Sequence, residues 1–141
     1  MAKRKQSPKQ RAKKKAWTLL SQAIRLEAAD VDGYCQCCTC GKRLPWNRNM
    51  HACHFIDGRY LSVLFDERGI HPGCYACNVL LNGNKDAYWV FMEENYGRSV
   101  IDELRALKNK TVTYTLEELD EMIEGYAARI KKAKTEKGIS T

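Results

Sequence analysis

The sequence predicts an α+β fold: a small core made of a cysteine-stapled turn, a β-hairpin and a helix, surrounded by N- and C-terminal α-helices. Three observations lead to this expectation. The pairs Cys37-x-x-Cys40 and Cys74-x-x-Cys77 have the spacing of ligands in four-cysteine zinc sites. A segment with a favoured hairpin turn lies between the pairs, and apolar residues recur at helical spacing outside them. Knuckle, hairpin and then a helix bearing the second pair is the treble-clef order.

The N-terminal helix is expected to begin at Pro8, because proline suits the first helical position. Asp32-Gly33 should break its pattern. The apolar positions at helical spacing are Trp17, Leu20 and Ile24. After this helix, residues 35–40 form the predicted knuckle, and Gly41 supplies the tight turn that follows it. Leu44-Pro45-Trp46 is predicted to be a connecting loop.

Residues 50–56 and 59–65 are predicted to pair as a β-hairpin. Asp57-Gly58 is a favoured two-residue turn, and residues 61–65 alternate as a strand does. Alternation would place His51 and Cys53 on one face of the first strand and His54 on the other.

Four helical segments are predicted after this hairpin, with their aromatic and methionine stripes in the core. The first begins at Cys74 and is interrupted at Asn82-Gly83-Asn84, and the second is capped by Asp86 and ends at Gly97. The third covers Ser99–Lys108. The last begins at the capping box Thr115-x-x-Glu118.

Length and charge indicate one domain of 141 residues with net charge +7 and basic ends. We expect a basic arm at 1–15, a zinc-containing domain at 16–130 and a basic tail at 131–141. Residues 1–15 contain no acidic side chain, which favours binding to a polyanion over a merely solubilising role. The predicted nucleic-acid contacts are Lys3, Arg4, Lys5, Lys9, Arg11, Lys13, Lys14, Lys15 and Arg59.

No apolar run is long enough to span a membrane, and no apolar segment follows the basic N-terminus as in a secretory signal. We therefore expect a cytoplasmic protein without a membrane partner. In that reducing compartment clustered cysteines bind metal more often than they form disulfides.

The predicted zinc ligands are Cys37, Cys40, Cys74 and Cys77. Cys35-x-x-Cys38 has the same spacing and is an alternative first pair, although Gly41 after Cys40 favours the 37/40 choice. The remaining thiols, with Cys53, are expected in the core unless one of them enters a metal shell.

All three histidines of the chain, His51, His54 and His71, lie between the two cysteine pairs. Hydrolysis of a phosphodiester at neutral pH needs a base to activate water and a divalent cation to stabilise charge on the phosphate. A hairpin histidine fits the first requirement. Asn78, directly after Cys77, lies where a helix side chain would help to hold the cation.

The chain resembles the NinG (Rap) recombination proteins of lambdoid phages, a group related to HNH, ββα-metal endonucleases. The matching residues lie within about 16–130; they are Ile24-Arg25-Leu26, Cys37-x-Thr39-Cys40-Gly41, His54-Phe55-Ile56, Phe65-Asp66-Glu67-Arg68, His71-Pro72-x-Cys74, Cys77-Asn78, Gly83-Asn84, Tyr88 and Tyr96-Gly97. The resemblance implies metal-assisted, structure-selective cleavage of branched DNA, including Holliday junctions and displacement loops, in the cytoplasm of a bacterial host. It also implies phage or host recombination proteins as partners and a homodimer, because resolution cuts two symmetric strands.

On this resemblance His54 is the general base, Asn78 helps to bind Mg²⁺ or Mn²⁺, and His71 or His51 assists. The chain departs from the family pattern Asp-Ala-Gly-His, because His51 replaces the acid and Cys53 the glycine. Gly69 stands where HNH proteins carry the asparagine that orients the base. With His51 or Cys53 as a metal ligand, the site would suit Mn²⁺ or Zn²⁺ better than Mg²⁺. A non-catalytic zinc-stabilised DNA-binding or recruitment module, and an RNA-binding accessory protein, are the alternative interpretations.

Overall fold

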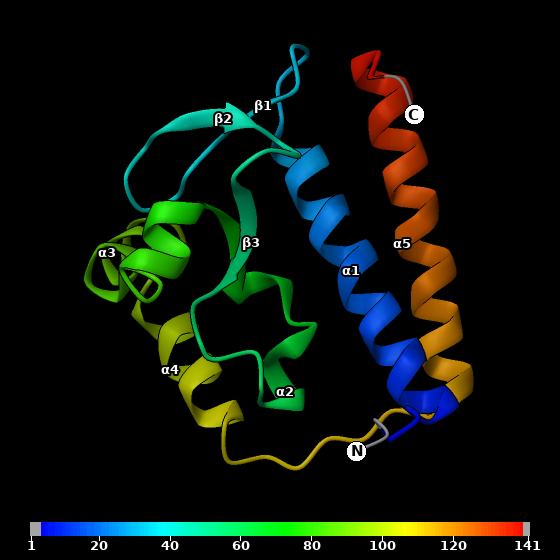
Figure 1. Ribbon diagram of the computed structural model, residues 1–141. Coiled ribbons are helices and arrows are strands. Elements are labelled where there is room, and N and C mark those ends of the chain that lie inside the picture. The colour runs from blue at the N-terminus through cyan, green and yellow to red at the C-terminus, as the bar shows by residue number, and fades with distance from the viewer. Residues whose placement is uncertain (1–3, 140–141) are drawn as a thin grey trace.

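Two long helices lie side by side and run in the same direction along one side of the molecule (Figure 1). The computed structural model describes residues 4–139. Helix α1 spans Pro8–Ala28 and α5 spans Leu116–Lys137. Small side chains on α1, including Ala23, let α5 approach closely, so that Ile130 and Ala133 are buried against α1. The Nζ of Lys137 donates to the last carbonyls of α1, which ties the two C-terminal ends together.

Local sequence signals at the starts of these helices are confirmed. Ser7 and Gln10 form a capping box before α1, with Pro8 at the first helical position. Thr115 and Glu118 form the predicted capping box before α5. Residues 8–15 of the basic N-terminal segment are therefore helical, as are residues 131–137 at the other end.

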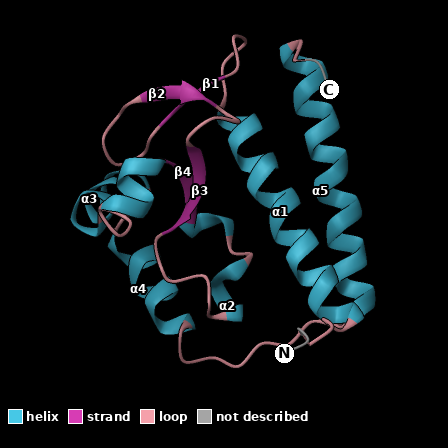
Figure 2. Ribbon diagram, in the orientation of Figure 1, coloured by secondary structure: helices cyan, strands magenta, loops and turns pink. Residues whose placement is uncertain are grey.

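Two antiparallel two-stranded sheets pack beside α1 (Figure 2). β1 (Tyr34–Gln36) pairs with β2 (Arg43–Pro45), and the first cysteine pair lies in the turn between them. The segment predicted as a connecting loop at 44–46 is thus partly a strand, because the knuckle turn brings Arg43 opposite Gln36.

The predicted hairpin of 50–56 with 59–65 is wrong. β3 (Met50–His54) instead pairs with β4 (Ile70–Cys74) in the register Cys53 opposite His71. Proline and glycine are disfavoured within strands, but a two-stranded sheet has open edges that need no N–H from Pro72. Residues 59–65 contain the short helix α2 (Leu61–Leu64), followed by the 3₁₀ turn η1 (Glu67–Gly69).

The chain leaves β4 through the π-helical turn η2 (Ala76–Leu80) and enters α3 (Lys85–Asn95) and α4 (Arg98–Leu107). The helix expected from Cys74 is thus a single turn. Asn84 is left-handed and α3 begins at the next residue, so Asp86 lies in the first turn and is not the cap that we predicted. Gly97, with φ of 87°, separates α3 from α4 as expected.

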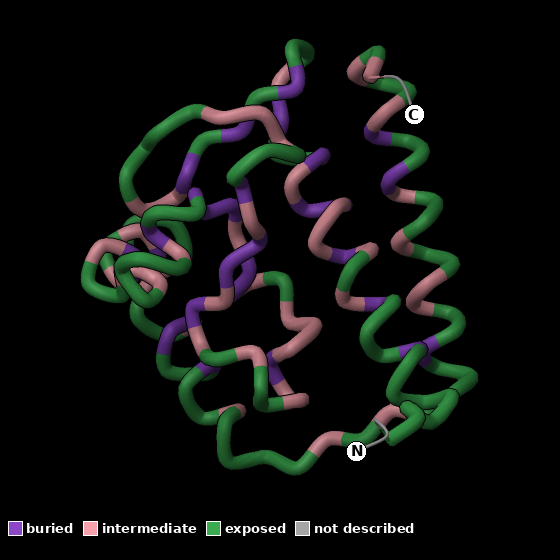
Figure 3. The backbone as a smooth tube through the Cα atoms, viewed as in Figure 1, coloured by how far each residue is buried: buried purple, intermediate pink, exposed green. Residues whose placement is uncertain are grey.

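The core runs along β3 and β4 and the inner helix faces, where buried positions gather (Figure 3). Tyr88 and Met92 of α3 are fully buried against Ile101 and Leu104 of α4, which confirms the core role of the α3 stripe. None of the helices within residues 4–139 combines the length and apolar character that crossing a membrane requires.

Candidate functional site

Four cysteines come together where the β1–β2 turn meets β4 and η2. The Sγ atoms of Cys37, Cys40, Cys74 and Cys77 all lie within 4.8 Å of one another, and those of Cys40 and Cys74 are 3.7 Å apart. A tetrahedral zinc with bonds of about 2.3 Å to sulfur separates its ligands by about 3.8 Å. This cluster therefore has the geometry to hold a metal ion such as zinc.

The surroundings of Cys37 favour the thiolate that a metal binds. Burial raises the pKa of its thiol, but the backbone N–H of Cys40, the Thr39 hydroxyl and the backbone N–H of Cys74 together lower it below the usual value. Cys35 differs, because burial raises its pKa to about 11 and its thiol donates to the Arg25 carbonyl at 3.1 Å. The geometry thus favours the 37/40 pair over 35/38.

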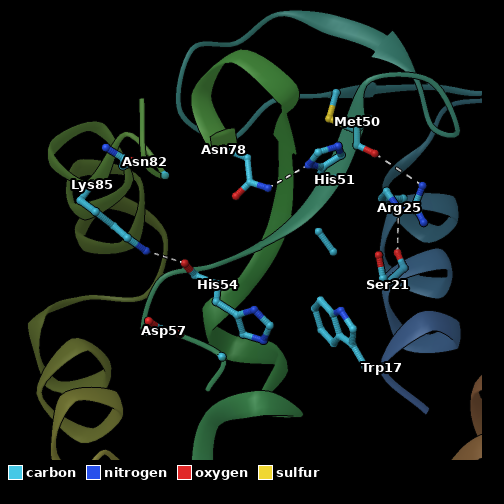
Figure 4. A pocket seen from close by; sticks show the side chains of 13 residues that line it. Trp17, Ser21, Arg25, Met50, His51, His54, Asp57, Asn78, Asn82 and Lys85 are labelled. Carbon is cyan, nitrogen blue, oxygen red and sulfur yellow. Dashed lines mark hydrogen bonds between the residues drawn. The ribbon is translucent and has the colours of Figure 1, made fainter. Parts of the chain in front are cut away.

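A cavity of about 650 Å³ lies next to this cluster, between α1, β3, η2 and the start of α3 (Figure 4). Its lining residues are Trp17, Ser21, Arg25, Met50, His51, Ala52, His54, Asp57, Gly58, Asn78, Asn82, Gly83 and Lys85. Three of the four predicted catalytic residues, His51, His54 and Asn78, line it. The face assignment from simple alternation fails here, since His51 and His54 reach the same cavity.

His54 is held so that one ring nitrogen stays available. Its Nε2–H donates to the carbonyl of Leu64 at 3.0 Å, which leaves Nδ1 as the acceptor nitrogen. The indole of Trp17 lies against the ring with centroids 4.5 Å apart. A Cβ on Gly58 would come within 2.7 Å of Cε1, so only glycine fits there. Burial lowers the pKa of His54, which favours the neutral ring.

His51 and Asn78 form a pair at the end of the cavity nearest the cysteine cluster (Figure 4). The Asn78 amide nitrogen donates to Nδ1 of His51 at 2.8 Å. Burial and, to a smaller extent, the charge of Arg25 lower the pKa of His51, so this imidazole is also neutral. An imidazole nitrogen and an amide oxygen are ligands that divalent cations of intermediate softness accept, and a cation bound here would replace the hydrogen bond between Asn78 and His51.

His71 is not among the residues that line the cavity. Its Nδ1–H donates to the Tyr88 hydroxyl at 2.9 Å, and Nε2 accepts from the Tyr96 hydroxyl at 2.8 Å. The Tyr88 hydroxyl in turn donates to the carbonyl of Cys53. Burial lowers the pKa of His71 to about 4. Both ring nitrogens are engaged, so His71 has the contacts of a bracing residue in the core.

Gly69 is buried and also acts through its backbone. Its carbonyl accepts from the N–H of Phe55 at 2.8 Å and so extends the β3–β4 pairing. A Cβ there would meet Leu104 at 3.3 Å. His54 is bound by the Leu64 carbonyl and not by a side chain at position 69.

Two basic residues that line the cavity were not among the site residues predicted from the sequence. Arg25 on α1 donates to the carbonyls of Ser21 and Trp46 at 3.0 and 2.9 Å. Lys85 on α3 donates to the carbonyls of His54 and Phe55 at 2.7 and 3.0 Å. Arg25 belongs to a segment that carries the resemblance, but nothing local indicated that α1 and α3 face one cavity. Asp57 supplies the one carboxylate among the lining residues.

None of the predicted nucleic-acid contacts within the described residues lines this cavity. Arg59 is exposed and pairs with Asp57 at 2.8 Å. Lys3 lies outside the described residues. The others are exposed before or on the N-terminal half of α1; they are Arg4, Lys5, Lys9, Arg11, Lys13, Lys14 and Lys15.

Comparison with known proteins identifies the family. The curated protein ninG of Salmonella phage P22 is 27% identical over 116 residues, which cover 78% of this chain and 53% of that protein. The chain thus spans about half the length of this relative. No solved structure matches. The family model described as bacteriophage lambda NinG protein matches residues 1–136. That match covers nearly the whole chain, which therefore belongs to the NinG family of bacteriophage proteins.

Proposed function

We propose that this chain is a metal-dependent endonuclease that cleaves branched DNA, including Holliday junctions and displacement loops, during phage recombination. The observation that carries the proposal is the setting of His54. Its Nε2–H is bound by the Leu64 carbonyl, and its neutral ring presents Nδ1 beside a cavity that also contains Arg25 and Lys85. A fixed neutral imidazole next to cationic side chains is suited to phosphodiester hydrolysis.

In this proposal Nδ1 of His54 removes a proton from the attacking water. The proton stays on the imidazole while the bond from phosphorus to the departing oxygen breaks. Arg25 and Lys85 attract the phosphate into the cavity and offset its negative charge. His51 and Asn78 are the residues that would hold the catalytic cation, through an imidazole nitrogen and the amide oxygen in place of the hydrogen bond between them. An imidazole ligand favours Mn²⁺ over Mg²⁺. The bound cation would stabilise charge on the phosphate and on the departing 3′ oxygen.

The cysteine cluster has a structural role in this scheme, as a treble-clef zinc site. It fixes the β1–β2 turn, the end of β4 and η2, and Asn78 lies within η2 directly after Cys77. Zinc binding would thereby fix the position of Asn78 relative to His51. The exposed cations before and along the start of α1 would bind DNA arms, and a homodimer would cut the two symmetric strands of a junction.

The test is cleavage of a labelled four-way junction and of a matched linear duplex by zinc-loaded protein, with Mg²⁺ or Mn²⁺. His54→Ala and the closer mimic His54→Gln serve as variants, each checked for zinc content and helical signal. We expect cation-dependent cutting of the junction that both variants lose. Cutting by folded, zinc-loaded His54→Ala at the wild-type rate would show that His54 is not the base.

A second candidate is a non-catalytic zinc-stabilised module that binds or recruits DNA. It is favoured by the lack of a carboxylate next to His51 and Asn78, since the one lining carboxylate, Asp57, is paired with Arg59. Tight, junction-selective binding by the wild-type protein without cutting in either cation would support this second function over the first.

A further inference from the structure

Two further depressions continue from the cavity on its α3 side. The first has a volume of about 390 Å³ and is lined by Phe55, Ile56, Lys85, Asp86, Trp89, Arg105 and Lys108. The second has a volume of about 370 Å³ and is lined by Asp102, Arg105, Ala106, Lys108 and Asn109. Lys85 also lines the His54 cavity, and Arg105 with Lys108 lines both depressions. The three hollows therefore adjoin one another. We call the depressions along Lys85, Trp89, Arg105 and Lys108 the α3–α4 groove.

The cations of this groove are not neutralised within the part of the chain that the structure describes. Arg105 and Lys108 are exposed, and neither forms an ion pair there. Asp102, the acid nearest to them in the second depression, is bound by Arg98 at 3.1 Å. Asp86 is the other acid of the groove. The positive charge of Arg105 and Lys108 is thus available to an anionic ligand.

Aromatic rings hold these cations in place without cancelling their charge. The guanidinium carbon of Arg105 lies 5.6 Å from the ring centroid of Trp89, which Arg98 also approaches at 5.3 Å. The Nζ of Lys108 lies 5.3 Å from the ring centroid of Tyr60. A cation that rests on a ring keeps its charge and loses less side-chain freedom when a phosphate binds. This arrangement differs from scattered surface lysines, because Arg105 and Lys108 each rest on an aromatic ring.

The groove also has a position that suits an extended ligand. Helices α3 and α4 lie on the opposite side of β3 from α1 (Figure 1). The His54 cavity lies between them, lined by Trp17, Ser21 and Arg25 from α1 and by Lys85 from α3. A strand whose phosphate occupies the cavity can therefore continue over α1 in one direction and along the α3–α4 groove in the other.

We propose that the α3–α4 groove binds the phosphate backbone of a DNA arm that leaves the His54 cavity, with Arg105 and Lys108 as its phosphate contacts. The inference rests on the proposed function, in which DNA contacts lie in the His54 cavity and along the basic start of α1. It adds a second contact surface on the other side of the cavity. Two such surfaces let the protein engage two arms of a junction at once, whereas a linear duplex follows one path.

The test measures binding of a labelled four-way junction by the full-length, zinc-loaded double variant Arg105→Ala/Lys108→Ala. Ca²⁺ replaces the catalytic cation, so that affinity is read without cutting, over a series of salt concentrations. We expect junction affinity at low salt to fall roughly tenfold or more, and the slope of log affinity against log salt to shrink by about 1.8, since about 0.9 is lost per phosphate contact. Affinity for linear duplex should fall less.

The matched control is Lys131→Ala/Lys132→Ala, which removes the same charge from exposed positions of α5, on the far side of the molecule (Figure 1). The proposal is overturned if Arg105→Ala/Lys108→Ala and this control change junction affinity and salt slope equally. Failure of the nuclease proposal and failure of the groove proposal give different results. A wild-type protein that binds junctions but never cuts them contradicts the nuclease alone, and still allows the groove to be tested. A wild-type protein that binds no junction overturns both.

Discussion

The indole of Trp17 and the imidazole of His54 lie face to face at a tilt of 31°, with their centroids 4.5 Å apart. Trp17 belongs to α1 and His54 to β3, so packing of the helix against the sheet sets the position of the ring. On another side, Gly58 lies so close that no Cβ fits. With the hydrogen bond to Leu64, these contacts fix the ring of the proposed base.

Replacing Gly58 with alanine should displace His54. The added Cβ would lie 2.7 Å from Cε1 and 2.8 Å from Nδ1, and Trp17 leaves the ring little room to retreat. A misplacement of about 1 Å commonly costs about a hundredfold in rate, so we expect Gly58→Ala to lose at least tenfold in junction cleavage. Single-turnover cleavage would measure this.

Gly125→Ala is the control for that variant. Gly125 is an exposed position within α5, where a Cβ meets nothing within 4 Å. The exchange should leave cleavage unchanged and stabilise the helix by about 0.5–1 kcal/mol. Equal cleavage by the two alanine variants would show that Gly58 does not position the ring.

Removing the indole with Trp17→Ala should raise the pKa of His54. Burial disfavours the charged imidazolium and lowers this pKa, and Lys85 acts in the same direction, while the Leu64 carbonyl and Asp57 oppose it. Exposure to water would therefore move the pKa up toward about 6.5. Arg25 and His51, which line the same cavity, are unchanged in this variant. NMR titration of His54 would record the shift, and the acid limb of cleavage should move to higher pH with it.

The companion variant Trp17→Phe retains an aromatic face and should keep most of the lowered pKa. A His54 pKa that is the same in the wild type and in Trp17→Ala would mean that the indole does not shield the imidazole from water.

Loss of one cysteine of the four-cysteine cluster should remove metal and destabilise the fold. Cys74 is the last residue of β4 and is buried, and its Sγ is 3.7 Å from that of Cys40. We expect Cys74→Ser to contain less than one zinc per chain and to melt at lower temperature, since a structural zinc contributes directly to folding. Elemental analysis and thermal unfolding would measure both.

Cys35→Ala is the matched thiol variant, because Cys35 is equally buried but donates to the Arg25 carbonyl instead of joining the cluster. It should retain a full complement of zinc. Loss of zinc from folded Cys35→Ala would show instead that Cys35 and Cys38 form the first ligand pair.

Stability should fall with acidification because of His71. Its folded-state pKa is about 4, below the unfolded value of about 6.5, so between these values the unfolded chain binds the proton and the folded protein does not. The stabilising contribution is complete above about pH 6.5 and declines as the pH falls toward 4. It amounts to at most about 3 kcal/mol.

Urea unfolding at a series of pH values would show this decline, and His71→Gln should have a shallower one between pH 6.5 and 4. Carboxylates and the other histidines titrate in both proteins, so the difference isolates His71. Parallel curves for the two proteins would contradict the expectation.

The basic start of α1 should contribute a salt-dependent share of DNA affinity. Lys13, Lys14 and Lys15 are exposed, and replacing all three with alanine should reduce the salt slope of junction binding by up to about 2.7. Cleavage of bound DNA should continue, because none of the three lines the His54 cavity. An unchanged slope would restrict this segment to a solubilising role.

Local sequence patterns predict the features that depend on neighbouring residues. The capping boxes at Ser7 and Thr115 close within three residues, so α1 and α5 began where expected. The Cys-x-x-Cys spacing likewise brings two thiols together within one turn. The pairs 37/40 and 74/77 could therefore be chosen, and the structure brings them into one cluster.

Which distant segments meet depends on long-range packing that local sequence patterns do not contain. The sheet partner of β3 is a strand that contains Pro72 and Gly73, because strand pairing depends on long-range hydrogen bonds and burial that no local pattern encodes. That pairing sent His71 into the aromatic core while His51 and His54 reached the cavity. Arg25 and Lys85 joined them from α1 and α3, since packing of whole helices determines which side chains share a cavity.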